Sequence, residues 1–166
     1  KYVVINTHYK HEMLQAHFAD APIKISLEFP DVLETGGGLK AALPMLETNP
    51  VITLNSDVVW AGKNPLQELI NHWDSSRMDG LLLCIYPTQK YGHEGPGDFL
   101  MDTQGALCRQ GDLVYSGAQI IKTDLLDQID DKVFSLNRLW DVMLKKKTLF
   151  GIIYSGLWCD VGTPEG

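Results

Sequence analysis

The chain has 166 residues, a formal net charge of −7 at neutral pH, 45% hydrophobic residues and 21% charged residues. This length suits a single domain over 1–166 with a buried core, and no apolar run approaches the roughly 20 residues that span a bilayer. The acidic excess argues against a nucleic-acid surface. We therefore expect neither a nucleic-acid partner nor a membrane partner, while the oligomeric state cannot be read from the sequence.

Short β-branched segments alternate with segments of helical periodicity through the first half of the chain. This alternation predicts strands at 2–6, 23–27, 51–55 and 80–86, and helices at 10–19, 36–46 and 65–76. The second half is less regular and predicts a loop at 91–97, two short strands within 98–110, a strand at 114–122, helices at 123–129 and 135–147, and strands at 148–155 and 157–161. Strands that alternate with helices at this spacing indicate βαβ units. The predicted fold class is therefore α/β, with a Rossmann-like, mixed but mainly parallel sheet flanked by helices.

The chain contains three cysteines, Cys84, Cys108 and Cys159. Their odd number and their spacing fit neither a zinc site nor a disulfide framework. We interpret them as reduced, buried thiols, which are typical of a cytoplasmic protein.

The first chemical candidate follows the predicted strand at 51–55, where the chain continues as Asn55-Ser56-Asp57. Ligands of open α/β sheets bind beyond the carboxyl ends of strands, and Asp57 lies at such an end. A carboxylate in this place can hold Mg²⁺, which in turn holds phosphate oxygens. The structural alternative is that Asp57 caps the next segment or stabilises a turn.

The second candidate is the glycine-rich segment LETGGGLKAAL at 33–43. Glycines allow a close approach of backbone and ligand, and the start of a helix favours anions. The segment matches neither the Walker A pattern nor the G-x-G-x-x-G fingerprint. The structural alternative is a flexible turn without a ligand.

The third candidate is the segment WCDVGTPE at 158–165, in which Asp160 ends a strand and precedes a turn. Together with Asp57, Asp160 would form a carboxylate pair, and a shared cation would offset the repulsion between the two charges. The structural alternative is an aspartate that accepts backbone N–H groups of the turn. His93 and Glu94, in the loop at 91–97, are expected to be solvated.

Six motifs occur in one order along the chain: LETGGGLKAALP, NSDVVW, GDF with a later aspartate and glycine, YSGAQI, SLNRLWD and WCDVGTPE. The set resembles the sugar-1-phosphate nucleotidyltransferases of the nucleoside-triphosphate transferase superfamily, and in particular the bacterial N-acetylmuramate-1-phosphate uridylyltransferase group. The resemblance extends over nearly the whole chain. It implies that a sugar 1-phosphate attacks the α-phosphorus of a nucleoside triphosphate, which gives a nucleotide sugar and pyrophosphate.

The resemblance also implies roles for ten residues of this chain and a Mg²⁺ cofactor. The catalytic pair Asp57 and Asp160 would hold the Mg²⁺ ion. The remaining residues divide into a nucleotide-binding set (Glu34, Thr35, Gly36, Gly37 and Asn55) and a sugar-binding set (Gly97, Asp98 and Gly117).

The family's glycine-rich GxGTRM-type loop, which cradles the triphosphate, is not found within residues 1–166. The resemblance places this loop and a first strand ahead of residue 1, and a terminal helix after residue 166. We therefore expect 1–166 to be an incomplete domain, with little or no transferase activity on its own.

The predicted function is transfer of a uridylyl group from UTP to a sugar 1-phosphate such as N-acetylmuramate 1-phosphate, in cell-wall sugar metabolism. Guanine or thymine nucleotides remain alternatives to uridine. Two other functions also stay open. One is a metal-dependent glycosyltransferase of related fold, although such enzymes usually carry Asp-x-Asp where this chain has Asn55-Ser56-Asp57. The other is a non-catalytic nucleotide-binding module.

Overall fold

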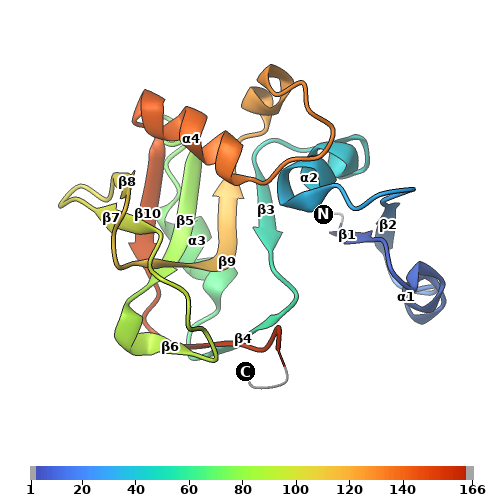
Figure 1. Cartoon of the computed structure of the whole chain (residues 1–166), viewed down its shortest axis with the longest axis horizontal. Coiled ribbons are helices and arrows are strands. Elements are labelled where there is room, and N and C mark those ends of the chain that lie inside the picture. The colour runs from blue at the N-terminus through green and yellow to red at the C-terminus, as the bar shows by residue number, and fades with distance from the viewer. Residues whose placement is uncertain (1–2, 164–166) are drawn as a thin grey trace. The chain divides into compact units, whose positions relative to one another are not determined.

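The computed structural model describes residues 3–163, and the chain divides into two compact units. Unit 1 contains the residues up to Asn49 together with Thr123–Val142. Unit 2 contains Pro50–Lys122 and the segment from Met143 onward. The single domain that we expected over 1–166 stays a prediction. Figure 1 labels most of the helices and strands of the two units.

Unit 1 is built around a parallel pair of strands and one long helix. Strand β1 (Val3–Thr7) pairs in parallel with β2 (Ile23–Leu27), and α1 (His11–His17) connects them. Helix α2 (Glu34–Leu46) packs against both strands. The 3₁₀ helix η2 (Asp124–Gln128) replaces the α-helix predicted at 123–129. Helix α4 (Asn137–Lys146), which belongs to unit 1 up to Val142 and to unit 2 from Met143, confirms the helix predicted at 135–147.

Unit 2 contains a four-stranded sheet in the order β10-β5-β9-β3. Its strands are β10 (Leu149–Ile153), β5 (Gly80–Ile85), β9 (Val114–Ile121) and β3 (Val51–Leu54). The pairing of β10 with β5 is parallel, whereas β9 is antiparallel to both of its neighbours. The predicted α/β fold is confirmed, but the pairings are mixed rather than mainly parallel, because β9 enters the sheet in the opposite direction.

Smaller elements complete unit 2. Strand β11 (Leu157–Asp160) pairs antiparallel with β4 (Val58–Ala61) and parallel with β6 (Lys90–Tyr91). Strands β7 (Phe99–Met101) and β8 (Leu107–Arg109) form the short hairpin that the sequence predicted within 98–110. The helices of this part are α3 (Pro65–His72), which packs against β5 and β9, and the 3₁₀ helix η1 (Pro87–Gln89).

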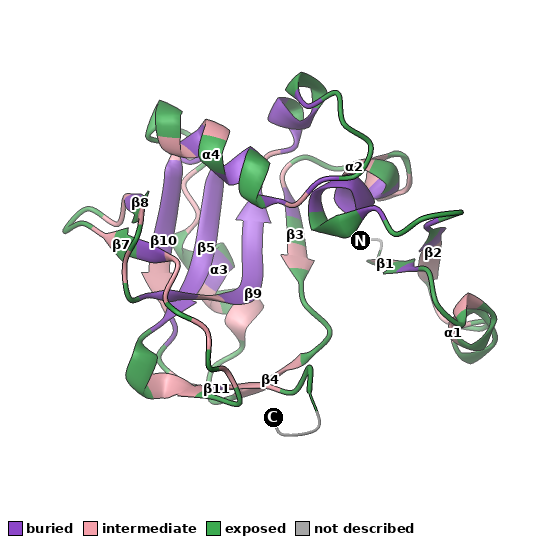
Figure 2. Ribbon diagram, viewed as in Figure 1, coloured by how far each residue is buried: buried purple, intermediate pink, exposed green. Residues whose placement is uncertain are grey.

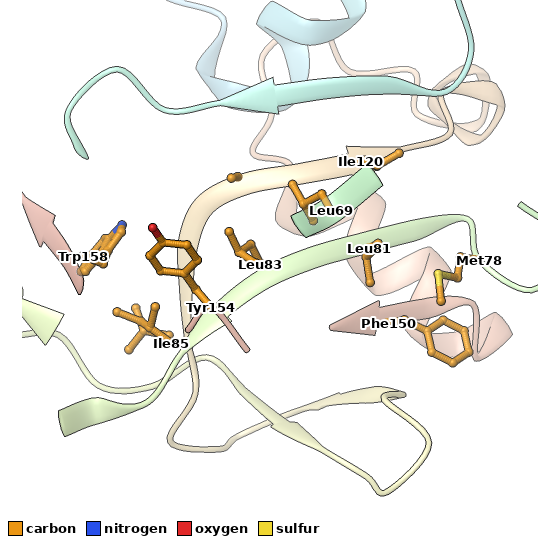
Figure 3. Close-up of a cluster of buried hydrophobic side chains, with 11 residues drawn as sticks. Leu69, Met78, Leu81, Leu83, Ile85, Ile120, Phe150, Tyr154 and Trp158 are labelled. Atoms are coloured by element: carbon orange, nitrogen blue, oxygen red, sulfur yellow. The ribbon is translucent and has the colours of Figure 1, made fainter. Parts of the chain in front are cut away.

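The hydrophobic core of unit 2 surrounds β5, which is buried at all six of its positions (Figure 2). Leu81, Leu83 and Ile85 of this strand join a cluster that also contains Phe150 and Trp158 (Figure 3). At the edge of this cluster, the indole N–H of Trp60 is buried without a hydrogen-bond partner among the described residues. The indole of Trp158 donates to the Ser116 carbonyl at 2.8 Å, which allows the ring to be buried without an unpaired donor.

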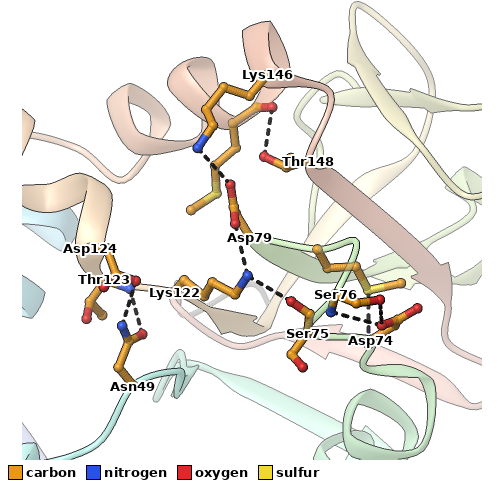
Figure 4. Close-up of polar contacts among 12 residues, drawn as sticks. Asn49, Asp74, Ser75, Ser76, Asp79, Lys122, Thr123, Asp124, Lys146 and Thr148 are labelled. Carbon is orange, nitrogen blue, oxygen red and sulfur yellow. Dashed lines mark hydrogen bonds and ion pairs between the residues drawn. The ribbon is translucent and has the colours of Figure 1, made fainter.

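A group of ion pairs lies at the start of β5. Both carboxylate oxygens of Asp79 are paired, one with Lys122 and one with Lys146, each at 3.1 Å (Figure 4). Burial alone would raise the pKa of Asp79, but hydrogen bonds from Thr148, Lys122 and Lys146, with the charge of Lys146, lower it below the ordinary value. The group therefore favours an ionised Asp79.

The three cysteines differ in their surroundings. Cys84 is buried in β5, and burial, with the nearby charge of Asp98, raises the pKa of its thiol to about 12. Cys108 is exposed and Cys159 is half-buried. The prediction of buried thiols is therefore wrong for Cys108, because alternate residues of its hairpin strand face solvent. Among residues 3–163, no helix is long and apolar enough to cross a membrane.

Candidate active site

The two aspartates that the sequence predicted as a pair lie at neighbouring strand ends of unit 2. Asp57 directly precedes β4, and Asp160 is the last residue of β11. These strands are antiparallel, with Asp160 opposite Val58, and the N–H of Val161 donates to the Asp57 carbonyl at 2.8 Å. The pairing therefore brings together two carboxylates that are far apart in the sequence.

Gly162 lies between the two carboxylates and leaves space there. A Cβ atom at this position would lie 3.1 Å from Oδ1 of Asp160 and 3.2 Å from Oδ2 of Asp57. The two oxygens thus face the same small space, and any residue larger than glycine at position 162 would narrow it. Gly162 also donates its N–H to Oδ1 of Asp160 at 3.0 Å. This contact bears out the turn interaction that we considered as the structural alternative for Asp160, and it is compatible with a second role.

This arrangement fits a Mg²⁺ ion whose coordination would be completed by phosphate oxygens and water. Within residues 3–163, no group of three or more His, Cys, Asp or Glu side chains is arranged to hold a metal by itself. Mg²⁺ in phosphate-transfer sites is typically held by one or two carboxylates, with phosphate oxygens and water as the other ligands. Two convergent carboxylate oxygens around an open space are the donor set that this chemistry uses.

His93 also belongs to this site, although we expected it to be solvated. Its Nδ1 lies 3.2 Å from Oδ2 of Asp160, and its ring packs edge-on against Trp158 with 5.9 Å between the ring centroids. Only 28% of its side chain is exposed. The expectation was wrong because the loop at 91–97 leaves β6 directly beside β11. No local sequence pattern signals this contact, which depends on the pairing of the two strands.

A hollow opens beside Asp160. It has a volume of about 690 Å³ and is lined by Gly92, His93, Glu94, Asp160 and Thr163. It has room for a phosphorylated sugar, and pockets of this size are typical of small-molecule sites. Neither Glu94 nor Thr163 is among the residues that the sequence predicted for a site.

The predicted nucleotide-binding glycines lie in unit 1, within the first turn of α2. They do not form a flexible turn, because Gly36 and Gly37 both donate their N–H groups to the carbonyl of Phe134, at 2.9 and 3.0 Å. A Cβ on Gly36 would lie 2.4 Å from the Phe134 ring. This structural constraint explains why glycine occurs here. A nucleotide contact by either residue stays a prediction and would have to use other atoms than these amides.

Glu34 and Thr35 precede these glycines and are both exposed. Glu34 has a φ angle of 60°, a left-handed conformation that is uncommon for glutamate. The hydroxyl of Thr35 accepts a hydrogen bond from the N–H of Leu136 at 3.0 Å. The carboxylate of Glu34 therefore faces solvent at the start of α2, and its role toward a nucleotide stays a prediction.

Asn55 and Gly117 lie together in unit 2. The N–H of Asn55 donates to the Gly117 carbonyl at 2.8 Å. Gly117 has a φ angle of 89°, and a Cβ there would lie 2.8 Å from that of Asn55. The structure thus places a residue predicted for the nucleotide next to one predicted for the sugar, while Gly117 itself is buried.

Gly97 and Asp98 have structural partners. A Cβ on Gly97 would lie 2.2 Å from the Gly111 carbonyl oxygen, so the close approach of two backbone segments requires glycine here. The carboxylate of Asp98 accepts a hydrogen bond from the N–H of Tyr115 at 2.9 Å. These contacts attach the segment before β7 to β9, and contacts of Gly97 or Asp98 with a sugar remain predictions.

Solved structures of other proteins share the architecture of this chain. HddC from Yersinia pseudotuberculosis, complexed with GMP-PN, matches with a TM-score of 0.72 at 20% identity, over 98% of this chain and 73% of that one. The inositol-1-phosphate CTP transferase from T. maritima matches with a TM-score of 0.72 at 10% identity, over 98% of this chain and 71% of that one. Such low identities establish the fold alone.

Sequence similarity goes further. No protein-family model matches the chain. The N-acetylmuramate alpha-1-phosphate uridylyltransferase of Caulobacter vibrioides is 34% identical, over 98% of this chain and 73% of that protein. The enzyme of the same name from Neisseria meningitidis is 26% identical over 79% of the chain, and the mannose-1-phosphate guanyltransferase of Kluyveromyces lactis is 27% identical over 80%. The chain covers 58% and 39% of the lengths of these last two proteins. The chain therefore belongs to the sugar-1-phosphate nucleotidyltransferase family, as the order of its motifs predicted.

Proposed function

We propose that the chain transfers a uridylyl group from UTP to an amino-sugar 1-phosphate, with N-acetylmuramate 1-phosphate as the first candidate. The observation that carries this proposal is the 34% identity to the N-acetylmuramate alpha-1-phosphate uridylyltransferase of Caulobacter vibrioides over 98% of the chain. The convergence of Asp57 and Asp160 on one space supports the chemistry. A location in the cytoplasm, where such a reaction would find UTP, is part of the proposal.

The proposed reaction forms one bond and breaks another at the same phosphorus. A phosphate oxygen of the sugar 1-phosphate attacks the α-phosphorus of UTP, and the bond from that phosphorus to the bridging oxygen breaks, which releases pyrophosphate. Both reactants are anions, so catalysis depends on alignment and on charge neutralisation. Mg²⁺, which Asp57 and Asp160 would hold, would supply positive charge beside the phosphates.

The protein's own residues have two tasks in this proposal. Asp57 and Asp160, whose oxygens face the space at Gly162, would hold there the cation that attracts the anionic phosphates, and would in this way define where these phosphates lie. The hollow beside Asp160 would receive the sugar 1-phosphate. This hollow is lined by His93 and Glu94, whose hydrogen-bonding groups suit sugar hydroxyls.

A second candidate is guanylyl transfer to mannose 1-phosphate. It is favoured by the mannose-1-phosphate guanyltransferases of yeasts such as Kluyveromyces lactis, which match 80% of the chain at 27% identity. We place it second because both the identity and the coverage are lower than for the Caulobacter enzyme.

The test is pyrophosphate release by a protein that carries this chain, with UTP or GTP combined with N-acetylmuramate 1-phosphate or mannose 1-phosphate. We expect the fastest turnover with UTP and N-acetylmuramate 1-phosphate. A preference for GTP and mannose 1-phosphate would replace the first candidate by the second. Calorimetric binding of UTP without turnover would instead favour a non-catalytic module, and consumption of a nucleotide sugar without pyrophosphate chemistry would favour a glycosyltransferase.

The substitutions Asp57→Asn and Asp160→Asn test the site itself. We expect each to lower kcat/KM by about 10²–10³-fold, which is typical when one charge-stabilising group is lost. The control is Asp20→Asn, which makes the same change in charge at an exposed position of unit 1. If either site variant kept the turnover of the control, the metal role of that aspartate would be wrong.

A further inference from the structure

We propose that His93 is a positioning residue, which holds the Asp160 carboxylate in the orientation that allows it to share a divalent cation with Asp57. This inference rests on the metal role of Asp57 and Asp160 in the proposed function. It adds a third residue to the site, from the loop at 91–97, for which the sequence predicted no role.

The first observation is that both oxygens of Asp160 are held by hydrogen bonds. Gly162 donates its N–H to Oδ1 at 3.0 Å, and Nδ1 of His93 lies 3.2 Å from Oδ2. A carboxylate offers only acceptors, so the imidazole nitrogen must be the donor. Two donors, one to each oxygen, fix the plane of the carboxylate, whereas one donor would leave it free to rotate.

The second observation is that His93 is itself held in place. Its ring packs edge-on against Trp158, which is only 3% exposed and whose indole N–H is bonded to the Ser116 carbonyl at 2.8 Å. The loop that carries His93 begins where β6 pairs with β11, with Tyr91 opposite Cys159. The pairing of β6 with β11 therefore places His93 beside the Asp160 carboxylate.

Contacts within the loop also hold His93 in place. Nζ of Lys90 donates to the Gly95 carbonyl at 2.8 Å, which joins the two ends of the segment. A Cβ on Gly95 would lie 2.7 Å from Nε2 of His93, so glycine lets the backbone pass close to the ring. These contacts restrict the position of His93 before any ligand binds.

The orientation of Asp160 should affect how tightly a cation binds, because cations prefer a defined coordination geometry. Mg²⁺ requires near-octahedral coordination, so a carboxylate that must first be ordered binds it less tightly. Groups that orient a metal ligand without touching the metal typically change affinity or activity by 10–100-fold. His93 donates to Oδ2 of Asp160, while Oδ1 lies on the side of the space shared with Asp57.

The test is titration of the protein with manganese(II) chloride alone, followed by electron paramagnetic resonance. His93→Phe keeps an aromatic ring against Trp158 but removes the donor, and we expect about 10-fold weaker binding. His93→Asn keeps a donor at the position of Nδ1, and we expect binding within about 3-fold of the parent protein. The matched control is His72→Phe on α3, where the exposed ring is hydrogen-bonded to the Glu68 carbonyl of its own helix, and this substitution should leave binding unchanged.

The outcomes separate this inference from the proposed function. If Asp57→Asn and Asp160→Asn abolish Mn²⁺ binding but His93→Phe binds like the control, the role of His93 is wrong and the metal site stands. If the two aspartate variants bind Mn²⁺ like the parent protein, the metal site fails, whatever His93 does. Equal loss of binding in His93→Phe and His93→Asn would also overturn the inference, because the asparagine should restore the donor.

Discussion

The strands of the two units differ sharply in how they are covered. In unit 2, β5 is buried at all six positions, whereas in unit 1 only Thr7 of the five residues of β1 is buried (Figure 2). Both segments are rich in aliphatic residues, so composition alone does not account for the difference. A helix packs against each strand, α3 against β5 and α2 against β1, but β5 has a hydrogen-bonded neighbour on each side, whereas β1 pairs only with β2 among the described strands.

Polar contacts have a larger part in unit 1. The buried carboxylate of Glu28 accepts the N–H of Leu33 at 2.7 Å, and Asn6 donates to the Gly38 carbonyl at 2.9 Å. Such bonds each contribute about 1 kcal/mol, whereas a buried leucine side chain contributes about 2 kcal/mol or more. Unit 2 therefore depends mainly on apolar packing, whereas the β1–β2 region depends more on individual hydrogen bonds.

The largest effect is expected when a side chain of β5 is truncated, and a truncation in β1 serves as the comparison. Leu83→Ala in the fully buried β5 should lower the free energy of unfolding by about 2–5 kcal/mol, because it leaves a cavity. Ile5→Ala in the partly exposed β1 should cost about 1 kcal/mol. Urea unfolding with native-state hydrogen exchange measures both losses. Equal losses of unfolding free energy in the two variants would mean that the difference in burial between β5 and β1 does not affect stability.

A smaller effect is expected from Gly36→Ala at the start of α2. Alanine favours a helix by about 1 kcal/mol over glycine, but its Cβ would lie 2.4 Å from the Phe134 ring and 2.8 Å from the Phe134 carbonyl oxygen. Overpacking of this kind costs about 1–3 kcal/mol, so we expect a net loss and faster amide exchange at Gly36 and Gly37. A gain in stability would show that the segment at Phe134 can move away without cost.

The smallest effect concerns Asp79 in unit 2. Because its pKa in the folded protein is lowered, Asp79 stabilises the fold at pH values above its ordinary pKa, near 4. This contribution disappears as the pH falls through the folded pKa. We expect Asp79→Asn to cost about 1 kcal/mol or less at pH 7 and nothing at pH 2, as measured by urea unfolding. A cost that did not depend on pH would exclude the ion pairs as its source, and Asp20→Asn is the control for the change in charge.

Local signals in the sequence predicted much of unit 2. The apolar run at 80–86 marked β5, and Pro65 marked the start of α3, where the Asn64 side chain accepts the N–H groups of Leu66 and Gln67. These features follow from periodicity and from helix capping, which depend on neighbours in the chain. The direction of β9 could not be predicted in this way, because antiparallel and parallel strands share the same apolar pattern.

The sequence by itself determined the α/β class and the family, and it predicted Asp57 and Asp160 as a pair, because strand ends and ordered motifs can be read along the chain. Only the tertiary structure decided that Gly162 leaves the space between the two carboxylates, that the amides of Gly36 and Gly37 are bonded to Phe134, and that His93 reaches Asp160. Each of these contacts joins segments through strand pairing or loop packing. Such contacts depend on distances in space, which no spacing along the chain encodes.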